Sequence, residues 1–172
     1  CDVFGNAKKF FNEDDRAYPV NVYGQSKLCG ELNVEVEANK AKIRYYILRT
    51  SWLYSPHKKT FVDVVARSLI VGEKIKVISD QYGIPTRAED FAKAAIDFIK
   101  HPSRYPKGIY HLTCSYKKPV SKYDIAIEVA NALNLNKRLL IKTRGKNIFL
   151  VSRPKSATLI NTKFFKLPDW RE

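Results

Sequence analysis

The chain alternates short apolar runs with longer segments of helical periodicity, and this alternation constrains its fold more than any other feature. Runs rich in β-branched and aromatic residues predict strands at 43–49, 75–78, 109–113 and 139–143. Helical periodicity and helix start signals predict helices at 21–38, 61–71, 87–99 and 121–133. Because strands separated by helices are typical of parallel sheets with right-handed crossovers, the sequence predicts an α/β fold.

Local signals mark the ends of several of these elements. Ser121, with the acid Asp124 three residues later, has the pattern of a capping box at a helix start. Gly72 is placed to end the helix at 61–71. Before the first helix, we expect the end of a strand at 1–4 and a polar loop at 6–18.

Length and composition indicate a soluble domain with a sizeable core. The chain has 172 residues, of which 45% are hydrophobic. No apolar run approaches the roughly 20 residues of a membrane span and no signal peptide opens the sequence, so we expect a cytosolic protein. Cys1, Cys29 and Cys114 form no C-x-x-C pair and are predicted to be small buried residues. A first residue that is cysteine, together with the absence of methionine, indicates a trimmed, truncated or incompletely represented chain.

A formal net charge of +14 raises nucleic-acid binding as an alternative function. Nucleic-acid binders normally gather their basic residues in a patch or stripe. Here they occur as scattered doublets at 8–9, 58–59 and 117–118. An excess of surface lysine explains this pattern at least as well, so nucleic-acid binding is the less favoured hypothesis.

Tyr23 and Lys27 are the first candidate catalytic residues. On a helix over 21–38, residues four apart lie one turn apart on the same face. A nearby ammonium favours the phenolate form of a tyrosine, which equips the pair for proton transfer near neutral pH. A Y-x-x-x-K match is common by chance, so the alternative is two residues on an exposed helix face.

Five sequence blocks surround this pair and recur in one order. They are P-V-N-V-Y-G-Q-S-K-L-C-G-E at 19–31, L-R-T-S-W-L-Y at 48–54, V-I-S-D-Q-Y-G-I-P-T at 77–86, G-I-Y-H-L at 108–112 and R-P-K-S-A-T-L at 153–159. Together they resemble the dTDP-4-dehydrorhamnose reductases, a branch of the extended short-chain dehydrogenase/reductases. The resemblance covers nearly the whole chain and is far more specific than the Tyr/Lys motif alone.

The resemblance implies an activity and a domain organisation. The activity is NAD(P)H-dependent reduction of the C4 keto group of dTDP-4-dehydro-6-deoxy-L-mannose to dTDP-L-rhamnose, with Tyr23 as proton donor. Lys27 favours the phenolate and holds the nicotinamide ribose. Residues 1–52 are expected to end a Rossmann-like core and 53–172 to form mainly a substrate-binding region that returns to the core. The substrate is a dTDP-sugar, and a homodimer is left open.

The sequence contains only part of the site expected for the cofactor, NADPH or NADH. A dinucleotide fold carries a glycine-rich turn whose backbone amides hold the pyrophosphate. None of the seven glycines has the G-x-x-G-x-x-G spacing. The resemblance implies that the turn lies upstream, so we expect the chain alone to bind dinucleotide weakly.

Four further residues are candidates for the substrate site. The resemblance implies that Trp52 packs against the sugar, whereas the alternative is a core position. Thr50 and Ser51 hydrogen-bond either the sugar or backbone groups at a strand end. Arg153 is suited to bidentate recognition of a diphosphate, with a surface ion pair as the alternative.

Other positions give weaker signals. The third catalytic group of the family, a serine or threonine, either corresponds to Cys1 or precedes the chain. The block at 77–86 adds Gln81, Pro85 and Thr86 as candidates whose contacts are open.

No metal site is predicted. His57, His101 and His111 form no metal motif, and the acidic run at 12–15 is interpreted as a solvated loop. Some family members respond to magnesium, but this sequence does not indicate it. A non-catalytic alternative is a binding or regulatory subunit like that of methionine adenosyltransferase, which has the same fold.

Overall fold

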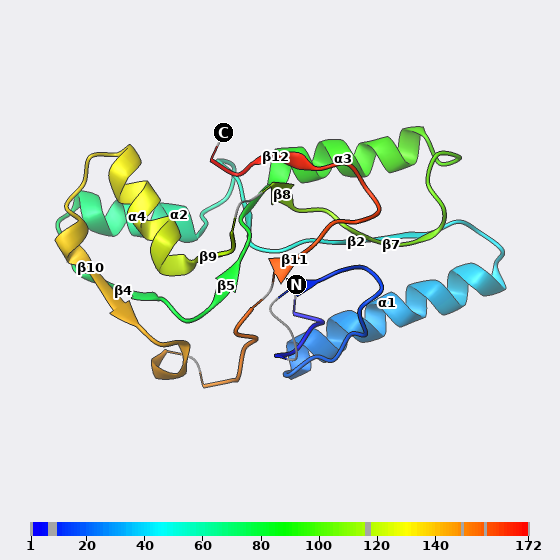
Figure 1. The fold of residues 1–172 in the computed structure, drawn as a ribbon, viewed down its shortest axis with the longest axis horizontal. Coiled ribbons are helices and arrows are strands. Elements are labelled where there is room, and N and C mark those ends of the chain that lie inside the picture. The colour runs from blue at the N-terminus through cyan, green and yellow to red at the C-terminus, as the bar shows by residue number, and fades with distance from the viewer. Residues whose placement is uncertain (1, 7–9, 116–117, 149, 157, 172) are drawn as a thin grey trace.

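Within the described residues, 2–6, 10–115, 118–148, 150–156 and 158–171, the computed structural model contains four α-helices and twelve short strands (Figure 1). The helices are α1 (Val22–Lys40), α2 (Phe61–Ile70), α3 (Ala88–Lys100) and α4 (Lys122–Ala132), with 3₁₀ turns η1 (Lys137–Leu139) and η2 (Gly145–Asn147). The strands are β1 (Phe10–Phe11), β2 (Tyr46–Arg49), β3 (Leu53–Tyr54), β4 (Ile75–Ile78), β5 (Tyr82–Gly83), β6 (Thr86–Arg87), β7 (Gly108–His111), β8 (Cys114–Ser115), β9 (Val120–Ser121), β10 (Leu140–Thr143), β11 (Thr158–Leu159) and β12 (Leu167–Asp169).

Among the described strands, parallel pairing predominates. β2 pairs with β7, from Tyr46 opposite Gly108 to Arg49 opposite His111. β4 pairs with β10, and the shorter parallel pairs are β1 with β11, β3 with β6 and β8 with β12. Only β5 and β9 are antiparallel in the part of the chain that the structure describes. The predicted α/β class with parallel crossovers is therefore confirmed.

The β2–β7 pair lies between α1 and α3 (Figure 1). Successive residues of a strand point to opposite faces. Tyr46 points toward α3, where its ring centroid is 5.1 Å from that of Phe98. Arg49 lies on the other face, where it forms an ion pair with Glu31 of α1. The two helices thus cover opposite faces of the same strands.

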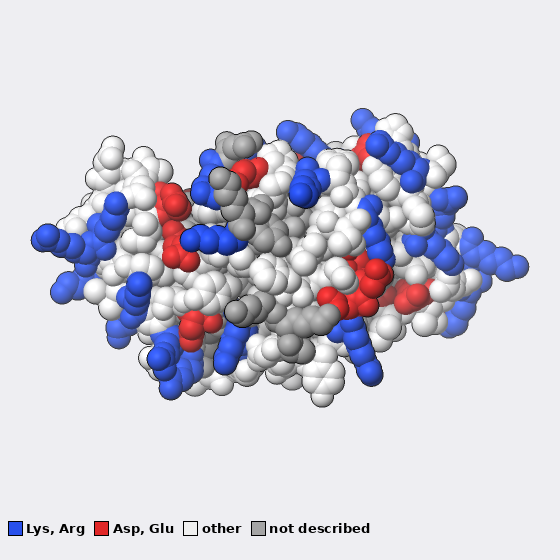
Figure 2. All heavy atoms as spheres, in the orientation of Figure 1, with Lys and Arg blue, Asp and Glu red and all other residues white. Residues whose placement is uncertain are grey.

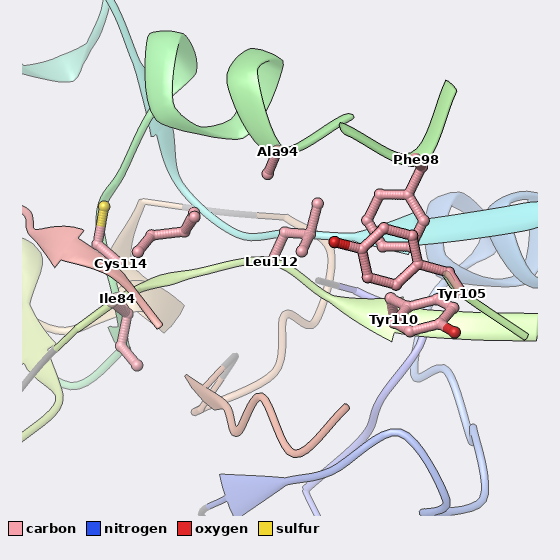
Figure 3. Packing of buried hydrophobic residues seen from close by; sticks show 8 residues of the cluster. Ile84, Ala94, Phe98, Tyr105, Tyr110, Leu112 and Cys114 are labelled. Carbon is pink, nitrogen blue, oxygen red and sulfur yellow. The ribbon is translucent and has the colours of Figure 1, made fainter. Parts of the chain in front are cut away.

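Two apolar clusters form most of the core. One packs α3 against β7, β8 and β12 and includes Phe98, whose ring centroid lies 4.8 Å from that of Tyr110 (Figure 3). The other lies where α2 and α4 contact β4 and β10, and it includes Val65, Val77 and Ala126. A third, smaller cluster joins the first residues to β1 and β11.

The starts of α2 and α4 are held by capping boxes. At α4, Ser121 Oγ accepts a hydrogen bond from Asp124 N at 3.1 Å, and Asp124 Oδ2 accepts one from Ser121 N at 2.8 Å. The capping box predicted there is therefore confirmed. Thr60 and Asp63 form a second box at α2, which the sequence also contains but which was not predicted.

Three expectations for the first 50 residues were wrong. Residues 2–3 form a turn rather than the end of a strand, while Cys1 lies outside the described residues. The predicted loop at 6–18 contains strand β1. The strand predicted to begin at residue 43 begins at Tyr46, because Ile43 and Arg44 are exposed in the connection from α1.

The acidic run at 12–15 is not simply a solvated loop. Glu13 is 5% exposed and accepts hydrogen bonds from the backbone amides of His111 and Thr162, at 3.2 and 3.1 Å. These partners lie 98 and 149 residues away in sequence, so Glu13 ties the start of the chain to two distant segments. Cys29 also differs from expectation, since it is exposed, whereas Cys114 is buried.

Charged side chains are distributed over the face seen in Figure 2. Lys and Arg are spread across it rather than gathered in a single patch. Within the described segments, no helix is long and apolar enough to cross a membrane.

Candidate functional site

The first turn of α1 positions Tyr23 and Lys27. Asn21 caps this helix, and its Oδ1 accepts a hydrogen bond from Gly24 N at 2.8 Å. Lys27 Nζ then lies 5.3 Å from the centroid of the Tyr23 ring, as expected for residues one turn apart. The Tyr23 side chain is 60% exposed, and both residues line a cleft of about 770 Å³. The phenol is therefore accessible to a ligand in this cleft.

Residues 50–52, which follow β2, also line the cleft. Thr50 Oγ1 is buried and has no hydrogen-bond partner among the described residues. Ser51 is buried, and its hydroxyl donates to the carbonyl of Ile84 at 3.1 Å. Of the two alternatives for Ser51, the structure thus favours a bond to the backbone. Ser51 fixes the 50–52 turn against the loop before β6.

Trp52 has a backbone conformation that is rare for an aromatic residue. Its φ is +46°, in the left-handed region. The carbonyl of Trp52 accepts a hydrogen bond from Thr86 N at 3.2 Å, and a Cβ on Gly83 would lie 2.9 Å from the indole. The turn and the close glycine hold the indole in the cleft wall. Trp52 therefore combines a strained backbone, which tends to occur at functional sites, with close packing against Gly83.

The residues that line the cleft include an ion pair that was not predicted. Arg49 Nε and Nη2 donate to the two carboxylate oxygens of Glu31 at 3.0 and 2.6 Å. The guanidinium also stacks on Phe4, with its central carbon 5.0 Å from the ring centroid. The two ion-pair side chains are only 4% and 14% exposed, so losing one partner would leave a buried charge. This pair fixes α1, and with it Tyr23, against β2.

Arg153 closes the cleft from the C-terminal part of the chain. Its segment is attached to the start of α1, because Asn21 Nδ2 donates to Ser152 O at 3.0 Å. The structure therefore brings together on one cleft all six residues that were predicted to form the site: Tyr23, Lys27, Thr50, Ser51, Trp52 and Arg153.

The weaker candidates lie elsewhere. Gln81 contacts Gly145, Thr86 is fully buried and Pro85 lines a second, smaller cavity. His57 and His101 are exposed. The described residues contain no group of three or more His, Cys, Asp or Glu side chains placed to hold a metal ion.

His111 is fully buried beside Glu13, and the two side chains affect each other's pKa. Burial lowers the pKa of His111 to about 4, although the charge of Glu13 opposes this shift. Burial acts to raise the pKa of Glu13, but hydrogen bonds from Thr162 and His111 hold it below its ordinary value. The pair is thus built to keep the histidine neutral and the glutamate charged.

Lys122, which lines the second, smaller cavity, is another residue that sequence reasoning missed. It is the first residue of α4, and its Nζ lies 5.7 Å from the Trp52 ring centroid and 5.5 Å from that of Phe61. Burial lowers the pKa of Lys122, and the charge of Arg153 adds to the effect. The only signal in the sequence was its place directly after the capping serine. Its proximity to Arg153 depends on the tertiary fold.

The whole chain is similar to one protein family and to several characterised relatives. Residues 2–172 match the family model described as RmlD substrate binding domain. A dTDP-4-dehydrorhamnose reductase of Escherichia coli K12 is 31% identical over 97% of this chain and 58% of that protein. One from Sinorhizobium fredii is 37% identical over 66% of this chain and 38% of that protein.

Solved structures give the same result. A dTDP-4-dehydrorhamnose reductase of Clostridium acetobutylicum has a TM-score of 0.84 and 30% identity, and the match covers 99% of this chain and 59% of that one. The Bacillus anthracis reductase, solved in complex with NADP, has a TM-score of 0.82 and 28% identity, with coverage of 98% and 59%. The chain spans about two fifths to three fifths of the length of these relatives.

Proposed function

The chain belongs to the family of RmlD substrate binding domains. We propose that it is the substrate-binding part of a dTDP-4-dehydrorhamnose reductase. The whole enzyme would reduce the C4 keto group of dTDP-4-dehydro-6-deoxy-L-mannose and yield dTDP-L-rhamnose. One observation carries the proposal: Tyr23, Lys27 and Trp52, which come from two separate parts of the sequence, line the same cleft.

Tyr23 has the position that a proton donor needs. Its exposed hydroxyl would protonate the substrate carbonyl oxygen while hydride adds to the carbonyl carbon, so that a C–H and an O–H bond form and the C=O double bond is reduced. The Lys27 ammonium beside the ring would stabilise the phenolate that remains. Trp52 would offer its flat face to the sugar ring, and Thr50 would supply a hydroxyl from the same segment.

The cofactor, NADPH or NADH, would supply the hydride when bound. The cleft fits its nicotinamide-ribose end, because Thr50 Oγ1 and Arg49 Nη1 are buried polar atoms without a hydrogen-bond partner among the described residues. Lys27 would hold the ribose. The glycines of the chain lack the G-x-x-G-x-x-G spacing of a phosphate-binding turn, so other polypeptide must hold the pyrophosphate. The division into 1–52 and 53–172 stays a prediction, as does a homodimer.

The test is a chimera of this chain with the cofactor-binding part of the E. coli reductase. Oxidation of NADPH would be followed by absorbance with the dTDP-4-dehydro sugar as substrate. We expect Tyr23→Phe to lower kcat by about 100-fold or more, because proton transfer by a positioned group contributes on that order.

Tyr45→Phe is the matched control. Tyr45 loses the same hydroxyl, but this group hydrogen-bonds Glu35 on the exposed side of α1 rather than lining the cleft. It should leave kcat within about twofold. Turnover that survives Tyr23→Phe unchanged would rule out the proposed mechanism.

A further inference from the structure

The sequence block at 77–86 carries part of the resemblance to the reductases, but the proposed reaction does not yet use it. Its last four residues, 83–86, are all buried. Of the described residues that line the cleft of Tyr23, none comes from this segment. The segment contacts instead the 50–52 turn, which does line that cleft. It is therefore placed to support the turn rather than to meet a ligand itself.

Two hydrogen bonds and one close contact join the two segments. The Ser51 hydroxyl donates to the carbonyl of Ile84 at 3.1 Å. The backbone amide of Thr86 donates to the carbonyl of Trp52 at 3.2 Å. The backbone of Gly83 packs against the Trp52 indole. The turn is thus held through a side chain, through its main chain and through the ring.

Gly83 lies in strand β5, where glycine is normally unfavourable. Its φ is outside the left-handed region that favours glycine, so the backbone conformation does not require this residue. A Cβ atom at this position would lie 2.9, 3.0 and 3.1 Å from three carbons of the Trp52 indole, whereas ordinary contacts are 3.4–4 Å. The close approach of the indole is therefore what excludes a side chain from position 83.

The same contact restricts where the indole can lie. The backbone of Trp52 is held at a φ of +46° by a turn whose carbonyl is bonded to Thr86. With the main chain fixed in this way, a methyl group on Gly83 can be accommodated only if the ring or strand β5 moves. Because the ring lines the cleft, its displacement would change the surface that a sugar meets.

We propose that Gly83 is a positioning residue for the reaction. By leaving room for the indole of Trp52, it sets where this ring meets the sugar, and it thereby governs the affinity for the sugar part of the substrate. The inference rests on the proposed function for the identity of the sugar. The dependence of the indole position on Gly83 does not rest on it.

Tryptophan fluorescence tests the position of the indole directly. The chain contains two tryptophans, so Trp170→Phe leaves Trp52 as its only one. In this background Gly83→Ala should shift the emission maximum of Trp52 and change its quenching by acrylamide, because the ring moves to a different environment. An unchanged spectrum with unchanged quenching would overturn the inference, whatever the chain binds.

Calorimetric titration tests the consequence for binding, with dTDP-L-rhamnose and, separately, dTDP as ligands. Gly83→Ala should weaken binding of dTDP-L-rhamnose by about tenfold, because a small misplacement of a positioning group is costly. It should leave binding of dTDP unchanged, since dTDP lacks the sugar. Equal weakening of both ligands would overturn the assignment of Gly83 to the sugar.

A double-mutant cycle shows whether Gly83 acts through Trp52. When Trp52→Ala has already removed the ring, Gly83→Ala should weaken binding of dTDP-L-rhamnose by less than about a further twofold. The same tenfold loss in both backgrounds would show that Gly83 acts by another route and would overturn the inference.

Gly30→Ala is the matched control. Gly30 lies on α1, and a Cβ atom there would meet nothing within 4 Å. This substitution should leave the Trp52 fluorescence and both affinities unchanged. Circular dichroism would show that each variant is folded.

The outcomes separate the inference from the proposed function. If Gly83→Ala binds dTDP-L-rhamnose as tightly as the unaltered chain, the inference is overturned and the reductase proposal stands. If the unaltered chain does not bind dTDP-L-rhamnose, the reductase proposal falls, and the fluorescence result alone decides whether Gly83 positions Trp52.

Discussion

Helices α1 and α3 contact opposite faces of the same pair of strands but differ in how much of their own surface they bury. Of the 13 residues of α3, Asp90, Ala94 and Phe98 are buried, and the last two belong to an extensive apolar cluster. The longer α1, with 19 residues, buries only Gly24 and Ala38. It leaves Leu32, Val34 and Val36 between 46% and 52% exposed.

The difference lies in how the helices pack. Helices α2, α3 and α4 each contribute buried side chains to an apolar cluster, even though Val64, Ile70, Ile96 and Ile99 of α2 and α3 are also exposed, whereas α1 buries no large side chain. We therefore expect substitutions on α3 to cost more stability than substitutions on α1, which holds the candidate catalytic pair.

The largest expected effect is a difference between the two helices in how much stability a substitution costs. Phe98→Ala on α3 should lower the free energy of unfolding by about 3–5 kcal/mol, because it opens a cavity in a packed core. Leu32→Ala on α1 should change it by less than about 0.5 kcal/mol, since the side chain is already half exposed. Urea unfolding followed by circular dichroism measures both. Equal losses would show that α1 is as well packed as α3.

A smaller effect concerns the junction between the first residues and β7. His111 is fully buried there, with its ring centroid 5.7 Å from that of Phe4. Burial lowers the pKa of His111 to about 4 in the folded protein, against an ordinary value of 6.5, so below about pH 6.5 the unfolded chain binds the proton first. The contribution of His111 to the free energy of unfolding should therefore be fully present above that pH. It should be smaller by about 2–3 kcal/mol at pH 4. The lowered pKa of Glu13 acts in the same direction.

Urea midpoints at a series of pH values from 7 to about 4 would measure this loss. His101→Asn is the control, because it removes an exposed histidine rather than the buried one. If the free energy of unfolding stayed constant across that range, protonation of His111 would have no effect on stability, and the prediction would be wrong.

Local sequence rules predicted the elements that depend on neighbouring residues. The α4 start follows from Ser121 and Asp124 within one turn, and the contact of Tyr23 with Lys27 follows from helical spacing. Strand β4 was predicted with its observed bounds, Ile75–Ile78. Candidate positions outside the first helix, such as Trp52 and Arg153, came from the resemblance to a family rather than from spacing.

Features that depend on distant contacts were not predictable in this way. Glu13 looked like part of a solvated acidic loop, but its hydrogen-bond donors come from segments about 100 and 150 residues away. Arg49 and Glu31 pair across 18 residues of sequence and between different elements. Lys122 meets Trp52 only because β9 brings the start of α4 beside β5. In each case the tertiary fold, rather than any local pattern, determines the contact.

The central claim is that the cleft between Tyr23 and Trp52 binds a dTDP-sugar for reduction at C4. The most direct test is a crystal structure of the chain with dTDP-L-rhamnose. The account predicts the rhamnose ring against the Trp52 indole, with its C4 hydroxyl within hydrogen-bonding distance, about 2.6–3.2 Å, of the Tyr23 hydroxyl. A sugar bound elsewhere, or one whose C4 points away from Tyr23, would contradict it.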